Sequence, residues 1–268
     1  MKANYHTHTR RCYHAIGSDE EYVVSAIKAG YDVLGFSDHT PWDYKSKFQA
    51  NMRMPLNQFD DYYNSIYKLK IKYQDQIKIL IGLECEYFEE YMPWLKAFII
   101  EKNIDYILLG NHYYQSDEKQ IYFGRACATI EMLNVYVDEC IKGMKTNLYS
   151  YLAHPDLFMR AYPSFDEACI EASYRLCEAA KQYDIPLEYN LSGVAYNEML
   201  KVEEYPHPKF WEIASKVGNR VMIGVDAHDN KDLENSKRRK QAEDFLNRLG
   251  CNLVEEIDLK DFNLSNLA

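Results

Sequence analysis

The stretch Asn4-Tyr5-His6-Thr7-His8 opens the chain, and a third histidine, His14, follows six residues later. Side chains of a β-strand alternate between its two faces, so His6 and His8 are expected to point to the same side. Two neutral imidazoles on one face supply half of a tetrahedral metal site. The function of the chain then depends on whether further ligands arrive at the ends of other strands.

Strand-like and helix-like segments alternate along the rest of the chain. Further apolar runs of strand length lie at residues 31–39, 77–86, 105–112, 148–154, 185–190 and 220–228. Helices are expected at residues 18–30, 57–76, 93–102, 125–145, 164–183, from 208 onward, and at 232–249. This β then α alternation predicts a parallel α/β barrel that forms a single domain over residues 1–268.

Helix starts carry recognisable capping signals. In a capping box, a Ser side chain and a Glu three residues later each accept a hydrogen bond from the other's backbone. Ser18 with Glu21 and Ser164 with Glu167 fit this pattern, and Pro208 is suited to the first position of a helix.

Composition limits the compartment and the partners. The formal charge is −10 and no long run of Lys or Arg occurs, which argues against nucleic acid, although a small phosphorylated substrate remains compatible if bound metals offset the acidic charge. Seven cysteines without a C-x-x-C pair indicate reduced thiols. No apolar run reaches the ~18 residues needed to span a bilayer, and no signal segment precedes His6. We therefore expect a cytoplasmic protein without membrane contact; the oligomeric state is left open.

The chemically informative side chains fall at or near the carboxyl ends of the expected strands, where the sites of α/β barrels lie. Seven of the eight histidines belong to this set or to the opening segment, and His207 is the exception. A single histidine at a strand end is commonly a hydrogen-bonded structural residue, Glu84 alone could form an ion pair, and Asp226 alone could cap a turn. Their recurrence favours a metal site, and Gly224 beneath Asp226 and His228 leaves room for it. The candidate metal ligands are His6, His8, His14, His39, Glu84, His112, His154, Asp226 and His228.

Nine candidates are too many for one catalytic zinc, which takes three or four protein ligands. They suit three divalent metals, and mixed imidazole and carboxylate ligation fits zinc, iron or manganese equally. Clustered divalent cations neutralise phosphoryl oxygens and lower the pKa of a bound water, which is what phosphate ester hydrolysis requires.

A set of motifs also resembles a known family across nearly the whole chain. The motifs are His6-Thr7-His8, Phe36–Pro41, Gly82–Tyr87, Leu152–Asp156 and Gly224–His228. As a set they resemble the polymerase and histidinol phosphatase (PHP) family of metal-dependent phosphoesterases. The related amidohydrolase barrels also begin with His-x-His but end on an Asp without the Asp-x-His pair, so they fit less well.

The resemblance implies a distorted (β/α)7 barrel of the TIM type with a trinuclear centre at the carboxyl ends of its strands. Residue by residue, it implies His6, His8, Glu84 and Asp226 at the first metal, Glu84 with His112 and His154 at the second, and His14, His39 and His228 at the third. The implied activity is hydrolysis of L-histidinol phosphate to L-histidinol and phosphate, in histidine biosynthesis. The expected step is attack on phosphorus by a hydroxide that bridges the first two metals.

Substrate recognition is expected from residues around this centre. Glu84, Asp226 and Arg160 are the catalytic candidates, and Arg160 is placed to bind the phosphate bidentately. Glu86 or Glu188 is expected to pair with the substrate ammonium, and Trp42, Tyr44 or Tyr114 to stack on its imidazole. No side chain is assigned as the acid that protonates the leaving alkoxide, and a metal-bound water would suffice for this role.

Two other functions remain open at this stage. One is a nucleotide or nucleic-acid phosphodiesterase of the same family. The other is a metal-binding regulatory or chaperone module that has lost catalysis, in which alanine at Glu84 or Asp226 would leave the binding role intact.

Overall fold

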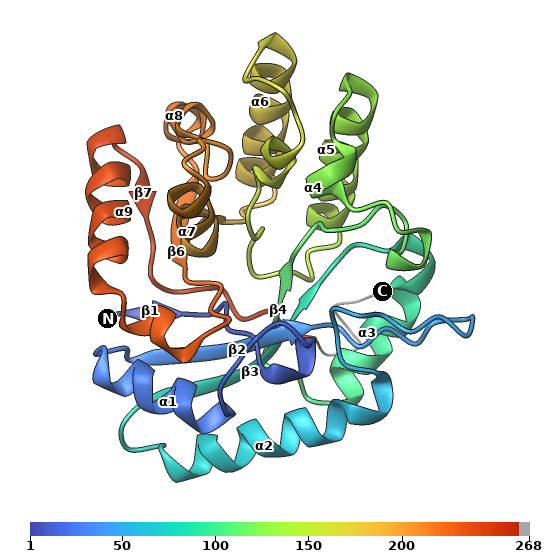
Figure 1. Ribbon diagram of the computed structural model, residues 1–268. Helices are drawn as coiled ribbons and strands as arrows, with labels where there is room; N and C mark the ends of the chain where they lie inside the picture. Colours follow the sequence, from blue (N-terminus) through green and yellow to red (C-terminus); the bar gives the residue numbers. More distant parts are fainter. Residues whose placement is uncertain (263–268) are drawn as a thin grey trace.

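Parallel strands form the centre of the computed structural model, which describes residues 1–262 (Figure 1). One sheet has the order β1 (Ala3–Asn4), β2 (Val33–His39), β3 (Lys78–Cys85) and β4 (Tyr106–Leu109). The second has the order β5 (Leu187–Asn190), β6 (Arg220–Gly224) and β7 (Asn252–Leu253). All pairings within the two sheets are parallel, as predicted.

Isolated parallel bridges join the two sheets. Leu152 pairs with Leu109 at the end of β4 on one side and with Leu187 of β5 on the other, and Thr7 pairs with Ala227. The predicted strand at residues 148–154 is therefore present only as the bridge at Leu152, without a regular strand. The physical reason is that the chain leaves the extended conformation at His154, whose φ is 31°, and that Pro155 has no backbone N–H to continue the pairing.

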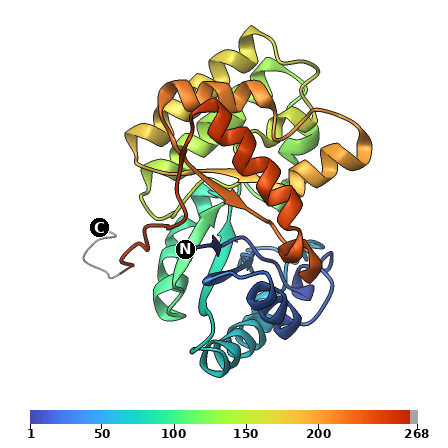
Figure 2. The same cartoon turned by 90° about the vertical axis from the view of Figure 1, so that its left-hand side faces the viewer.

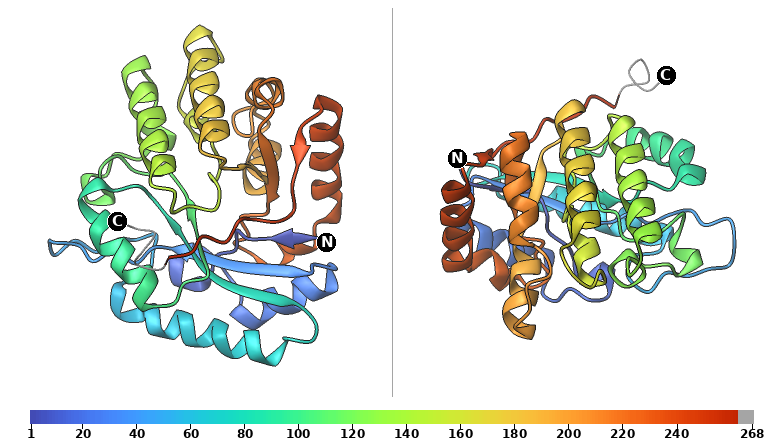
Figure 3. Two further views of the ribbon diagram at one scale, coloured as in Figure 1. Left: turned by 180° about the vertical axis from the view of Figure 1, so that it is seen from behind. Right: turned by 90° about the horizontal axis from the view of Figure 1, so that it is seen from above.

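Helices surround the strands on the outside (Figures 1 and 2). They are α1 (Asp19–Lys28), α2 (Phe59–Lys72), α3 (Met92–Glu101), α4 (Phe123–Ala126), α5 (Ile130–Lys145), α6 (Glu167–Gln182), α7 (Leu191–Leu200), α8 (Pro208–Val217) and α9 (Ser236–Leu249). Short 3₁₀ helices lie at Arg10–Cys12, Leu56–Gln58, Glu89–Tyr91, Asp117–Lys119, Leu157–Arg160 and Asn230–Glu234. Helices α5, α6, α8 and α9 stand next to one another along one side (Figure 3). Within residues 1–262, no helix combines the length and apolar character needed to cross a membrane.

The helix starts confirm one capping box and correct the other. Ser18 and Glu21 form both reciprocal hydrogen bonds at the start of α1, and Pro208 is the first residue of α8. At α6, however, the cap is Asp166, whose side chain accepts from the backbone N–H of Cys169, so the box predicted for Ser164 is wrong. Asp166 lies directly before the helix and takes the cap position, which leaves Glu167 too early to complete a box.

Two further helices differ from the sequence pattern. The predicted helix at residues 125–145 is split into α4 and α5, because Thr129 adopts an extended conformation and caps α5. Helix α7 was not indicated by the pattern, and Asn190 caps its first turn by accepting from the backbone N–H of Gly193.

Buried apolar side chains form two clusters on opposite faces of the strands. Ile79, Ile81 and Leu83 of β3 belong to the large cluster beneath the helices, whereas Leu80 belongs to a smaller one that includes Tyr5, Tyr106 and Tyr151. Glu84 continues the face of Leu80. The alternation predicted for β3 is thus confirmed. Glu84 lies at the carboxyl end of the strand, on the same face as the apolar Leu80 nearer its start.

Candidate metal centre

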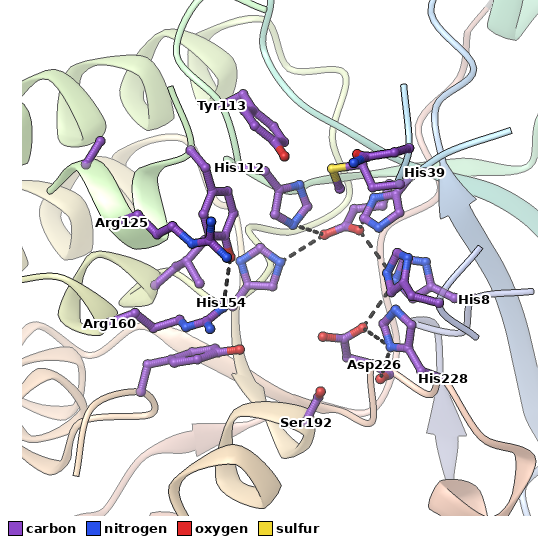
Figure 4. A pocket seen from close by; sticks show the side chains of 18 of the residues that line it. His8, His39, His112, Tyr113, Arg125, His154, Arg160, Ser192, Asp226 and His228 are labelled. Atoms are coloured by element: carbon purple, nitrogen blue, oxygen red, sulfur yellow. Dashed lines mark hydrogen bonds and ion pairs between the residues drawn. The ribbon is translucent and has the colours of Figure 1, made fainter. Parts of the chain in front are cut away.

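The structure brings all nine predicted metal ligands together at one end of the strands. A pocket of about 890 Å³ is lined by eight of them, namely His8, His14, His39, Glu84, His112, His154, Asp226 and His228. His6 is fully buried and reaches the same cluster through Glu84 and Asp226. In Figure 4, His8, His39 and His228 lie on one side of the cluster and His112 and His154 on the other.

Glu84 lies at the centre of this arrangement. Its Oε1 is 2.9 Å from Nε2 of His154, 3.3 Å from Nε2 of His112 and 3.5 Å from Nε2 of His6. Its Oε2 is 3.0 Å from Nδ1 of His39 and 3.5 Å from Nε2 of His8. Burial opposes ionisation of Glu84, but the surrounding imidazoles, His112 foremost, outweigh it and hold its pKa well below the usual range.

Asp226 is the second carboxylate that lies close to His6 and His8. Its Oδ1 lies 3.2 Å from Nε2 of His8, 3.5 Å from Nε2 of His6 and 3.4 Å from Nδ1 of His228. Burial again opposes ionisation, and His6 and His228 lower the pKa of Asp226 well below its usual value. Two ionised carboxylates therefore share the His6 and His8 pair.

Several histidines are held at one ring nitrogen by a group outside the cluster. Nδ1 of His6 lies 2.8 Å from Oε1 of Glu188, and Nδ1 of His112 lies 3.1 Å from Oε1 of Glu86. Nδ1 of His14 lies 2.7 Å from the carbonyl oxygen of Cys12. Such outer partners fix ring orientation and tautomer, and they leave the other nitrogen available for a metal.

Five of the residues expected at the substrate do not line this pocket. Glu86 and Glu188 are fully buried behind the histidine rings, because each carboxylate needs partners that offset its desolvation. Glu86 accepts hydrogen bonds from Arg53 at 2.6 and 3.0 Å and from Nε1 of Trp42 at 3.1 Å. Trp42 is only 2% exposed, and the structure places neither it nor Tyr114 in this pocket.

The other expected residues have mixed placements. Arg160 lines the pocket, as predicted, and its Nη1 donates to the hydroxyl of Tyr122 at 3.0 Å. Its guanidinium carbon lies 4.5 Å from the ring centroid of Tyr196. Tyr44 instead donates to Asp117 at 2.7 Å, away from the pocket lining.

Donor atoms of the cluster are buried without hydrogen-bond partners. Among them are Nε2 of His6, Nε2 of His228, Nδ1 of His154 and Oδ1 of Asp226. Leaving a buried polar atom unpaired costs ~1–3 kcal/mol, so a row of them in one place points to a ligand that completes them. Several groups of residues have donor atoms within 4.8 Å of one another, and three of these groups overlap within the predicted ligand set: His6–His8–Asp226, His6–Glu84–His154 and His8–His39–His228. This donor set fits divalent transition metals.

The backbone is strained at two of the predicted ligands. His154 has a φ of 31° and Asp226 a φ of 51°, in the left-handed region that side chains other than glycine rarely adopt. Such conformations cost about 1–3 kcal/mol and persist when the surroundings hold them. Here Glu188 accepts from the backbone N–H of His154 at 3.1 Å, and Asn190 donates to Asp226 at 3.1 Å.

Two glycines make space for the carboxylates. A Cβ atom at Gly110 would collide with Glu84, and one at Gly224 would collide with Glu188. The room expected above Gly224 is therefore present, but the side chain of Glu188 fills it.

Sequence reasoning missed a second arginine in the pocket. Arg125 lines the pocket and lies beside Arg160, across from His8 and His228 (Figure 4). No hydrogen bond or ion pair of its side chain is present within residues 1–262. Its position at the start of an expected helix gave no signal, because an exposed arginine is normal there.

Comparisons with known proteins agree over most of the chain. The PHP domain family matches residues 4–192. A probable histidinol-phosphatase from Schizosaccharomyces pombe is 34% identical over 254 residues, covering 85% of this chain and 81% of that protein. A histidinol-phosphatase from Bacillus subtilis is 23% identical over 264 residues, covering 87% of this chain and 96% of that protein.

A solved structure has a similar fold. It is the histidinol phosphate phosphatase from Lactococcus lactis in complex with zinc, L-histidinol and phosphate, with a TM-score of 0.74 and 20% identity, covering 96% of this chain and 98% of that one. This likeness confirms the predicted α/β fold with its parallel sheet.

Proposed function

The chain belongs to the PHP domain family, and from this membership we propose that it is a metal-dependent phosphomonoesterase that hydrolyses L-histidinol phosphate to L-histidinol and phosphate. Its relatives are named histidinol-phosphatases and align with most of its length. The observation that carries the proposal is the cluster of nine donor side chains, Glu84 among them, which faces a pocket with two arginines. The reaction belongs to histidine biosynthesis.

The finer architecture is part of this proposal. Bridges at Leu152 and Thr7 support a closed arrangement in which the two sheets form a distorted (β/α)7 barrel, with the active site at the carboxyl ends of the strands. Residues 1–268 are proposed as one domain, of which 263–268 lie outside the described part of the chain.

Three divalent metals, zinc, iron or manganese, are proposed as cofactors. His6, His8, Glu84 and Asp226 would hold one, Glu84, His112 and His154 a second, and His14, His39 and His228 a third. When bound, such metals neutralise phosphoryl oxygens and lower the pKa of bound water.

The chain's own groups position the ligands and the substrate. Glu188 and Glu86 fix the imidazoles of His6 and His112 from behind. Arg160 and Arg125 line the side of the pocket opposite the ligands of the proposed third metal, and their guanidinium groups are suited to phosphate oxygens. With the phosphate between the arginines and the cluster, water replaces the alcohol at phosphorus.

The experiment measures metal content together with phosphate release from L-histidinol phosphate. Asp226→Asn and His154→Asn are expected to lose bound metal and turnover in parallel. His207→Asn is the matched control, because His207 is the one histidine outside the set and caps α8, a role that asparagine can also fill. Normal turnover of Asp226→Asn with reduced metal would contradict the ligand assignment.

A further inference from the structure

One pocket-lining tyrosine has no role in the proposal so far. Tyr122 lies between β4 and α4, and its hydroxyl accepts a hydrogen bond from Nη1 of Arg160 at 3.0 Å. The residue lines the same pocket as Glu84 and Asp226. The dashed line that ends on Arg160 in Figure 4 marks this hydrogen bond.

The proposed reaction needs a proton donor. L-Histidinol leaves phosphorus as an alkoxide, a strong base, so protonation of the leaving oxygen in the transition state lowers the barrier. Glu84 and Asp226 are the carboxyl groups among the described residues that line the pocket, and both belong to the metal-ligand set. The histidines there belong to the metal-ligand set. The hydroxyl groups that remain are those of Tyr113, Tyr122, Ser192 and Tyr205.

Tyr122 differs from the other three because its hydroxyl accepts a hydrogen bond from Arg160, whereas the guanidinium lies 5.9 Å from the ring centroid of Tyr205. Because its oxygen accepts from the guanidinium, its own hydrogen stays free for another acceptor, and the charge left after donation faces a cation. Burial raises the pKa of Tyr122 and keeps the phenol protonated at neutral pH, while Arg160 acts in the opposite direction. Burial therefore keeps the phenol proton available for donation, and Arg160 stabilises the phenolate that remains after the proton has left.

The backbone fixes this tyrosine close to the cluster. Tyr122 forms an antiparallel bridge with Tyr113, the residue directly after the predicted ligand His112. The next residue, Phe123, donates its backbone N–H to the carbonyl of His112 at 2.8 Å. A Cβ atom at Gly124 would lie 2.6 Å from the ring of Tyr122, so glycine leaves the space that the ring occupies.

We propose that Tyr122 is the general acid of the reaction, an inference that rests on the proposed phosphomonoesterase function. As the water oxygen bonds to phosphorus, the bond from phosphorus to the alcohol oxygen breaks and its electron pair stays on that oxygen. The hydroxyl of Tyr122 gives its proton to this oxygen, and L-histidinol leaves neutral. The proton released by the attacking water restores the phenol, so protons balance over one turnover.

The test compares two leaving groups in the metal-loaded enzyme. An alkanol such as L-histidinol needs a proton, whereas p-nitrophenolate is stable without one. For Tyr122→Phe we expect kcat/KM to fall by ~10²-fold or more with L-histidinol phosphate and by no more than about threefold with p-nitrophenyl phosphate. Tyr162→Phe is the matched control, since Tyr162 lies outside the pocket lining and donates to Asp166, and it should leave both values unchanged.

Other results would overturn the assignment. An equal loss with both substrates would mean that Tyr122 acts by holding Arg160 for phosphate binding, and no loss would remove it from the mechanism. Metal content of the variant is measured alongside. Failure of the proposed function is detected separately, with the wild-type enzyme. If the wild type hydrolyses other alkyl phosphates but not L-histidinol phosphate, the proposed substrate is wrong. The role of Tyr122 is then tested by comparing those alkyl phosphates with p-nitrophenyl phosphate in the same way.

Discussion

Glu188 shows how a single buried residue outside the proposed metal-ligand set can hold the ligands in place. Its carboxylate accepts from His6, from the backbone N–H of His154 and from Asn190 at 2.8, 3.1 and 2.9 Å. Glu188→Gln keeps the size but removes the charge, so we expect metal affinity to fall about 10–100-fold. Competition with a chromophoric chelator measures this for Zn²⁺. Glu203→Gln, at an exposed position, is the control, and equal affinities for the two variants would contradict the positioning role.

At the residue scale, the sequence predicts faces better than partners. Strand alternation placed Glu84 and Glu86 on one face of the expected strand, and Glu84 does lie among the histidines. It could not predict that Glu86 would meet Arg53, which comes 33 residues earlier in an irregular segment without periodicity. For the same reason Glu86 was assigned to the substrate and is instead an internal partner of His112.

At the element scale, Arg53 joins segments that flank the pocket. Its guanidinium contacts Glu86 just after β3, Asp117 in a 3₁₀ helix and the carbonyl of Thr40 after β2, and it is 1% exposed. Breaking a buried ion pair leaves an uncompensated charge, so Arg53→Ala should lower the free energy of unfolding by about 3–5 kcal/mol. Urea unfolding of the metal-loaded protein measures it.

A matched surface pair provides the control for that loss. Lys45 and Glu90 are each 64% exposed and 2.7 Å apart, so Lys45→Ala should cost less than about 1 kcal/mol. If Arg53→Ala cost no more than Lys45→Ala, the buried network would not hold these segments together.

The start of α6 gives a second prediction at this scale. Asp166 caps the helix by accepting from the backbone N–H of Cys169 at 3.1 Å, while the side chain of Ser164 does not cap it. Asp166→Ala should therefore cost about 1 kcal/mol in thermal or urea unfolding, and Ser164→Ala much less. A larger effect at Ser164 would restore the capping box expected from the sequence.

The type of an element could be predicted where the spacing of its apolar residues and its capping residues indicated the same structure. The length of an element could not be predicted. The strand expected at 148–154 is reduced to the bridge at Leu152, and the strand expected at 220–228 ends at Gly224; His154 and Asp226, two residues further on in each case, adopt positive φ values. Side-chain pattern continues through such a turn, so it carries no signal of the change in backbone direction.

At the scale of the whole molecule, metal binding is expected to stabilise the fold. The buried donors without hydrogen-bond partners come from segments between His6 and His228, so a bound metal links both ends of the chain. Free metal at about 100 times its Kd should add about 2.7 kcal/mol to the free energy of unfolding. Calorimetry of chelated and reloaded protein measures this, and an unchanged Tm would contradict a metal that binds the native state.

The assembly of the nine ligands could be predicted because parallel strands bring their carboxyl ends to one edge. His6 and His228 are far apart in sequence, yet Thr7 pairs with Ala227. The pocket wall could not be predicted in the same way. Tyr122 lies in an irregular connection and Arg125 lies in the short helix α4. In neither segment does a periodic pattern in the sequence predict which way a side chain faces.

The most direct test of the account is phosphate release by the metal-loaded protein from L-histidinol phosphate, p-nitrophenyl phosphate and bis(p-nitrophenyl) phosphate at equal concentration. The account predicts the highest kcat/KM for L-histidinol phosphate and the lowest for the diester, despite its better leaving group. Faster cleavage of the diester would contradict the proposed function and favour a phosphodiesterase built on the same centre.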